Sequence, residues 1–169
     1  MTELFESVFI GSQKDCVQGT PDLRVIHACK YPCYSAQTEG KNPDKKHPNY
    51  LTIEKPDNLY LNVLDPEKPL FFLESFWAAR RFCCASDGDV LVHCNQGRSR
   101  SVVLGLLCGV WRGLIRPTTW EGALFDHTFE VPVTLGKGIN KFMRENWEFL
   151  TSEREEWSGI PEQRNLLNS

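Results

Sequence analysis

The stretch DVLVHCNQGRSRSVVLGLLCGVW, Asp89 to Trp111, joins two apolar segments through a short polar loop. Residues 90–92 form a brief run of valine and leucine, which predicts a buried strand. Residues 101–114 are apolar on nearly every side, which is typical of a helix in the middle of a protein. A cysteine, Cys94, stands where the strand ends. Its place at a strand-to-helix junction, with arginines close behind, calls for a chemical reason.

The start of a helix offers such a reason. Its first backbone N–H groups lack partners and the helix dipole is positive there, so it binds phosphate and stabilises a thiolate. Gly97 permits a positive φ or a close backbone approach. Arg100 can grip two phosphoryl oxygens, and Ser101 is placed to donate to the sulfur. A lone cysteine at a strand end is usually a small buried hydrophobe. The combination instead favours Cys94 as a nucleophile, oriented by His93.

Residues 92–101, VHCNQGRSRS, resemble the H-C-x5-R-S/T phosphate-binding loop of cysteine-dependent protein phosphatases. The S-R-S ending resembles the dual-specificity branch of the protein tyrosine phosphatase superfamily. The resemblance implies that Cys94 attacks phosphorus, that Arg100 binds the phosphoryl oxygens and that Ser101 eases departure of the thiolate. It also implies a phosphate-binding loop made by Asn95, Gln96, Gly97, Arg98, Ser99 and Arg100. We expect no metal and no cofactor.

This chemistry also needs an acid that protonates the leaving group, a role typically worth about 10²–10⁴ in rate. The family carries an aspartate for it on a separate loop that precedes the cysteine. In this chain, the segment LYLNVLDPEKP places Asp65 at the end of a predicted strand. By the resemblance, Asp65 is the general acid and later the base that activates water. An ordinary Asp-Pro turn is the alternative, and Glu67 and Asp57 are competing carboxylates.

Strands and helices alternate through the middle of the chain. This pattern predicts an α/β fold of one domain, with a central mixed sheet of roughly four to five strands and helices on both faces. A dual-specificity phosphatase-like domain would cover residues 1–150, followed by a polar tail or short helix at 151–169. The predicted strands are 8–11, 23–29, 50–53, 59–64 and 90–92. The predicted helices are 69–85, 101–114, one from Trp120 with a Thr118/Glu121 capping box, and 138–150.

Composition narrows the function classes. The 169 residues are 41% hydrophobic and 24% charged, which is typical of one globular domain. The net charge of −3 disfavours a nucleic-acid partner. The N-terminus lacks the features of a signal peptide, and the longest apolar run is too short to span a bilayer. We therefore expect a cytoplasmic protein with no membrane partner, and a monomer by default.

The seven cysteines are odd in number and show no disulfide framework, so free thiols are expected. Cys29 ends a strand that should neighbour the strand before Cys94. It is therefore the candidate redox partner for a protective disulfide with Cys94. Cys29 and Cys33 have no second cysteine pair, and the four histidines are scattered, so the spacing argues against a zinc site.

The sequence thus predicts a phosphatase for phosphorylated proteins, with phosphotyrosine first and phosphoserine or phosphothreonine as further substrates. A module that binds phosphoproteins without turnover is one alternative. Sulfurtransferases, arsenate reductases, phosphoinositide phosphatases and RNA 5′-phosphatases are enzymes with a similar loop. Phosphoinositide phosphatases tend to carry extra lysines in this loop. Here Arg98 is the only basic residue besides Arg100, which disfavours a lipid substrate. The long polar connection 34–58 departs from the family pattern and leaves the substrate open.

Overall fold

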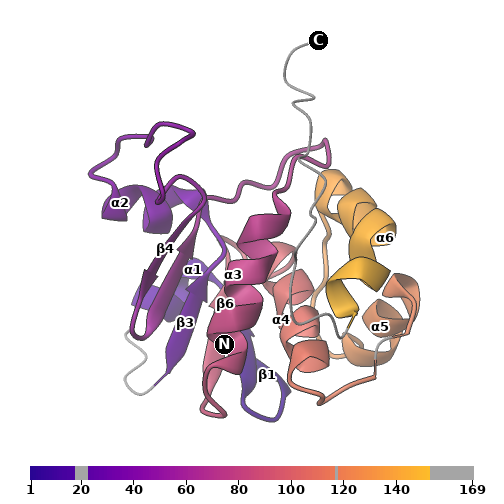
Figure 1. The fold of residues 1–169 in the computed structure, drawn as a ribbon. Coiled ribbons are helices and arrows are strands. Elements are labelled where there is room, and N and C mark those ends of the chain that lie inside the picture. The colour runs from indigo at the N-terminus through magenta and orange to yellow at the C-terminus, as the bar shows by residue number, and fades with distance from the viewer. Residues whose placement is uncertain (18–22, 117, 153–169) are drawn as a thin grey trace.

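A six-stranded sheet forms the centre of the protein (Figure 1). We describe it from a computed structural model, which covers residues 1–17, 23–116 and 118–152. The four inner strands run parallel, and the two edge strands are antiparallel to their neighbours. Their spatial order is β1 (Thr2–Phe5), β2 (Val8–Gly11), β6 (Val90–His93), β3 (Arg24–His27), β5 (Asn58–Leu61) and β4 (Thr52–Lys55).

The predicted α/β class, with a mixed sheet flanked by helices, is confirmed, and the sheet has six strands rather than four to five. The additional strand is β1, whose four residues TELF are exposed or half-buried and carry no alternating pattern. The helical segments are α1 (Gln13–Val17), η1 (Lys30–Tyr34), α2 (Ser35–Gln37), α3 (Leu73–Cys84), α4 (Arg100–Trp111), α5 (Trp120–His127) and α6 (Lys137–Thr151).

The two faces of the sheet are covered by different helices, because side chains alternate between faces along each strand. Ile10, Ile26 and Val92 belong to the main apolar core, against which α3 and α4 pack. Helices α5 and α6 pack in turn on α4, on the right in Figure 1. On the opposite face, His27 and His93 meet side chains from α1 and η1.

The ends of the helices show what sequence patterns can and cannot locate. Helix α4 begins at Arg100, one residue before the predicted start. The capping box predicted for Thr118 and Glu121 is wrong, because the N-cap is Thr119, whose Oγ1 accepts the hydrogen bond from the Gly122 amide at 3.1 Å, and Glu121 pairs with Arg144. The tail predicted for 151–169 lies outside the described residues from 153 onward, and Thr151 still belongs to α6. Among the helices described, none has the length and apolar character that crossing a membrane requires.

The candidate functional side chains gather at the carboxyl ends of the parallel strands β2, β3, β5 and β6. In open α/β sheets, ligands bind at this end of the strands. The connection from β5 to α3, residues 62–72, crosses the same end, in magenta across the upper part of Figure 1. The fold thereby brings the residues after β6 and the residues after β5 together.

Candidate active site

Cys94 follows directly after β6 and is only 2% exposed. Its Sγ lies 3.3 Å from Ser101 Oγ in the first turn of α4. Burial raises the pKa of the Cys94 thiol, but hydrogen bonds from the Ser101 hydroxyl and from the Ser101 and Gly97 amides, together with the Arg100 charge, lower it below its ordinary value on balance. These are surroundings that stabilise a thiolate.

Gly97 allows the loop after Cys94 to curl. Its φ is +75°, which favours glycine, and a Cβ at this position would lie 3.0 Å from the carbonyl carbon and oxygen of Gly11. The connection between β2 and α1 supports the loop from this side. The Cys94 amide donates to the Gly11 carbonyl and the Gln13 amide donates to the Asn95 carbonyl, both at 3.3 Å. The loop is therefore braced by a segment that the sequence did not single out.

Arg100 is 7% exposed, and both of its terminal nitrogens are held by the protein. Nη1 donates to the Val63 carbonyl at 3.0 Å and Nη2 donates to Asn95 Oδ1 at 2.7 Å. The Asn95 amide nitrogen donates in turn to the Tyr31 carbonyl at 2.7 Å. The buried Nε–H has no acceptor among the described residues. A fixed guanidinium with a free buried donor suits an anionic ligand.

Asp65 lies on the connection after β5, and its carboxylate Oδ2 is 3.9 Å from Arg100 Nε. The side chain is 23% exposed, so it is partly open to solvent. The competing carboxylates lie elsewhere. Glu67 is 87% exposed in its side chain and pairs with Lys137. Asp57 precedes β5, and its carbonyl accepts from the Val25 amide near the start of β3, at the other end of the parallel strands.

Residues 134–138, before and at the start of α6, connect the two loops. The Thr134 amide donates to the Arg98 carbonyl at 2.9 Å, and the Gly136 amide donates to Ser99 Oγ at 3.1 Å. A Cβ on Gly136 would stand 2.7 Å from Cγ of Asp65 and closer still to its Oδ1. This segment could not be predicted from the sequence, because nothing in TLGKG indicates which loop it contacts.

A cavity of about 210 Å³ opens at this place. Its walls bring together the predicted nucleophile, the predicted acid and the predicted phosphate clamp. The residues that line it are Asp65, Cys94, Asn95, Gln96, Arg98, Ser99, Arg100 and Thr134. Gly97 lies within the loop and Ser101 in the first turn of α4, 3.3 Å from Cys94 Sγ, and neither lines the cavity.

His93 is fully buried on the other face of the sheet. Its Nε2 lies 2.7 Å from His27 Nδ1, and its Nδ1 lies 3.5 Å from the Cys94 carbonyl. Burial, with the neighbouring His27, lowers the pKa of His93 to about 4. The imidazole at this position contacts the Cys94 carbonyl, and its role in orienting the nucleophile stays a prediction.

Cys29 follows β3 and is fully buried, but its thiol partner is Cys33. The hydrogen bond from Cys33 lowers the pKa of Cys29, against the effect of burial. Cys29 and Cys94 are both free thiols in the structure. The disulfide between them therefore stays a prediction.

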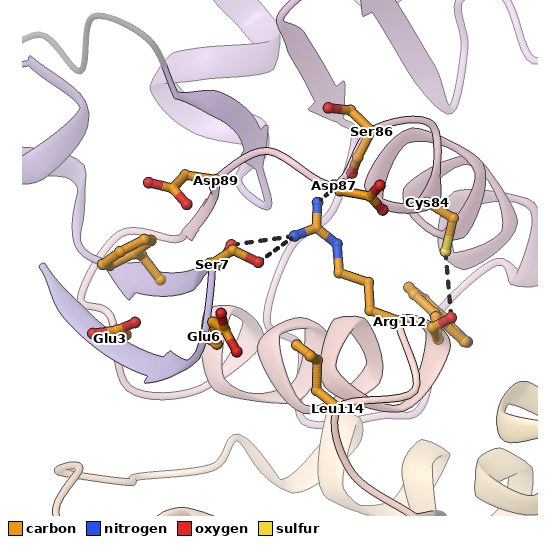
Figure 2. A pocket seen from close by; sticks show the side chains of 11 residues that line it. Glu3, Glu6, Ser7, Cys84, Ser86, Asp87, Asp89, Arg112 and Leu114 are labelled. Atoms are coloured by element: carbon orange, nitrogen blue, oxygen red, sulfur yellow. Dashed lines mark hydrogen bonds between the residues drawn. The ribbon is translucent and has the colours of Figure 1, made fainter.

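A larger cavity, of about 800 Å³, lies near the amino ends of β2 and β6, away from Cys94 (Figure 2). Arg112 occupies its wall and donates to the carbonyls of Cys83, Ser86 and Gly88 and to Ser7. The rest of the wall mixes apolar and small polar side chains with four carboxylates, Glu3, Glu6, Asp87 and Asp89. Because Arg112 is committed to backbone oxygens, it serves to tie the chain together at this end.

We compared the chain with protein-family models, curated proteins and solved structures. No family model and no curated protein matches it. Among solved structures, the fold is similar to the crystal structure of Cydia pomonella PTP-2 phosphatase, with a TM-score of 0.60. The two chains share 15% sequence identity over 86% of this chain and 88% of that one. At this identity the likeness establishes the fold, which is that of a phosphatase structure.

Proposed function

We propose that the protein is a cysteine-dependent phosphatase that hydrolyses phosphotyrosine in phosphorylated proteins, with phosphoserine and phosphothreonine as further substrates. The observation that carries the proposal is the cavity that joins Cys94, Asp65 and Arg100, with the buried Nε–H of Arg100 lacking an acceptor among the described residues. The fold, which is similar to that of Cydia pomonella PTP-2 phosphatase, supports the same reaction class. The dual-specificity type rests on the S-R-S loop ending alone.

In the first step, Cys94 Sγ attacks phosphorus while the bond from phosphorus to the leaving oxygen breaks. Asp65, protonated at the start, gives its proton to that oxygen and becomes a carboxylate. The Arg100 guanidinium and the loop amides stabilise the charge on the phosphoryl oxygens. Such stabilisation by fixed donors is usually the largest single contribution to catalysis. The product of this step is a cysteinyl-phosphate and the free alcohol or phenol.

In the second step, a water molecule attacks phosphorus and gives a proton to the Asp65 carboxylate. The bond from phosphorus to sulfur breaks, and inorganic phosphate leaves. Ser101 Oγ, 3.3 Å from Cys94 Sγ, donates a hydrogen bond to the departing thiolate. The enzyme is then back in its starting state, and no metal or redox cofactor takes part.

Release of inorganic phosphate from a phosphotyrosine peptide tests this proposal, with phosphoserine, phosphothreonine and phosphoinositide substrates measured in parallel. We expect the tyrosine peptide to be turned over and vanadate to inhibit. Cys94→Ser should abolish turnover, whereas Cys84→Ser, which changes an exposed thiol on α3, should leave it intact. Binding of the phosphopeptide without phosphate release would instead indicate a recognition module, and faster turnover of thiosulfate or arsenate would indicate a different enzyme.

A further inference from the structure

Four metal-binding side chains meet directly behind the candidate active site. They are Cys16, His27, Cys33 and His93, and their ligand atoms all lie within 4.8 Å of one another. Each comes from a different element: α1, β3, η1 and β6 respectively. His27 and His93 are paired across neighbouring parallel strands, so both rings lie on the face of the sheet that α1 and η1 cover.

The distances are close to those of a tetrahedral zinc site. His27 Nδ1 is 2.7 Å from His93 Nε2 and 3.6 Å from Cys16 Sγ, and Cys33 Sγ is 4.0 Å from His93 Nε2. Zinc holds nitrogen at about 2.0–2.1 Å and sulfur at about 2.3 Å, which places neighbouring ligand atoms roughly 3.3–3.8 Å apart. Shifts of less than about 1 Å would therefore bring all four atoms onto one ion.

The outer hydrogen bonds of the two histidines point to a metal as well. His27 Nε2 lies 2.9 Å from Asn58 Oδ1, and His93 Nδ1 faces the Cys94 carbonyl at 3.5 Å. If each outer nitrogen donates its proton to these acceptors, the inner nitrogens carry lone pairs that face each other at 2.7 Å. A proton on one inner nitrogen makes this contact a hydrogen bond, and a metal ion between the two rings would satisfy both lone pairs. Metal-binding histidines commonly use their second nitrogen in this way.

We propose that Cys16, His27, Cys33 and His93 form a structural Zn²⁺ site. Two thiolates and two imidazoles are the ligand set of closed, structural zinc sites, and soft sulfur ligands disfavour magnesium and calcium. The half-buried thiols of Cys16 and Cys33 leave a path for the ion, while both histidines are buried. The proposal departs from the expectation, drawn from sequence spacing, that the chain has no zinc site.

The site would hold the phosphate-binding loop in place from behind. His93 precedes Cys94 in the chain. Cys33 lies in η1, whose Tyr31 carbonyl accepts from Asn95, the residue that holds Arg100. Zinc would thus join α1 and η1 to β3 and β6, and β6 leads directly into the phosphate-binding loop. Its role is structural, and its test does not depend on enzymatic activity.

The test is binding of Zn²⁺ and of Co²⁺ to the full chain after treatment with EDTA. We expect one zinc ion per chain, a higher melting temperature with zinc, and a cobalt spectrum with intense visible bands and a thiolate charge-transfer band. Cys16→Ser and Cys33→Ser should each weaken zinc binding by at least about 100-fold, since even changes to outer partners of metal ligands cost 10–100-fold. Cys84→Ser is the matched control and should bind as the wild type does.

A second measurement needs no variant. Zinc should slow the alkylation of Cys16 and Cys33 of the wild-type chain by iodoacetamide at high pH, as read by mass spectrometry, and leave the alkylation rate of Cys84 unchanged. The proposal is overturned if no zinc binds at micromolar concentration, or if neither thiol is protected. It is overturned equally if Cys29→Ser abolishes the cobalt thiolate band while Cys33→Ser preserves it, because the ligand set would then be a different one.

Discussion

Gly136 and Asp65 are packed so closely that no side chain fits between them: a Cβ on Gly136 would stand 2.7 Å from Cγ of Asp65. The neighbouring Gly138 meets the loop in the same way, because a Cβ there would run into the carbonyl oxygens of Pro66 and Lys68. The start of α6 therefore packs directly against the loop that carries the proposed acid. Glycines on a distant segment therefore help to set the position of Asp65, which lies four residues beyond the end of β5.

Gly136→Ala should move Asp65 and slow the reaction without unfolding the chain. We expect turnover of a substrate with a poor leaving group to fall by roughly 10–100-fold, since a displacement of about 1 Å can cost that much. Gly88→Ala, in a turn at the other end of the sheet, should have no such effect, because a Cβ there meets only Ser86 Oγ at 3.2 Å. Equal rates for the two variants would mean that Gly136 does not position the acid.

Asp65→Asn should slow turnover according to the leaving group. A poor leaving group such as an alkyl alcohol needs the proton, so its rate should fall by up to about 10²–10⁴, whereas p-nitrophenol should leave with a smaller loss. The measurement is kcat for a series of aryl and alkyl phosphates. Glu67→Gln is the matched control, because Glu67 is exposed and paired with Lys137. A larger loss in Glu67→Gln than in Asp65→Asn would move the acid role to Glu67.

Gly97→Ala should abolish most of the activity. Gly113→Ala is the control that distinguishes a loss of stability from a disturbed phosphate-binding loop. Both glycines have a positive φ, +75° and +70°, so an alanine in either should cost about 1–2 kcal/mol of stability. Only Gly97 faces a neighbouring backbone, that of Gly11, while Gly113 faces open space. We expect both variants to unfold at lower urea, Gly97→Ala more so because its Cβ also meets the Gly11 backbone, and a loss of at least about 100-fold in turnover for Gly97→Ala alone. An active Gly97→Ala variant would show that the loop does not need this close approach.

Ser101→Ala should raise the pKa of Cys94, because it removes the hydroxyl that stabilises the thiolate from 3.3 Å. A hydrogen bond to a charged group is worth about 1.5–3 kcal/mol, so the shift should reach roughly one pH unit or more. The pH dependence of Cys94 alkylation, followed in EDTA, measures it: the midpoint should move to higher pH. Ser75→Ala, which removes another buried serine, should leave the midpoint unchanged.

The loop from His93 to Ser101 could be anticipated because its chemistry lies in consecutive residues. A strand, a cysteine, a glycine, an arginine and a helix start follow one another, and local backbone physics fixes their arrangement. The four inner strands could be anticipated for a similar reason, since each is a short apolar run. The edge strand β1 could not, because half of its residues are exposed and its identity depends on pairing with β2.

Contacts between distant segments escaped prediction. Gly136 is one glycine among several until the fold sets it against Asp65. Cys16, His27, Cys33 and His93 have no metal-binding spacing along the chain, yet β3 and β6 lie side by side and α1 and η1 close over them. Asn95 was expected to offer its backbone to a phosphate, and its side chain also fixes Arg100. Spacing along the sequence does not indicate these long-range contacts.

The most direct test of the central claim is to capture the covalent intermediate on Cys94. Ser101→Ala should slow the release of the thiolate, so acid quenching during turnover of a phosphotyrosine peptide should trap a phosphoryl group on the peptide that contains Cys94. We predict that mass spectrometry will find this adduct on Cys94, and none on Cys84 of the same sample. Phosphate release with no adduct on Cys94, or with the adduct on another residue, would contradict the account.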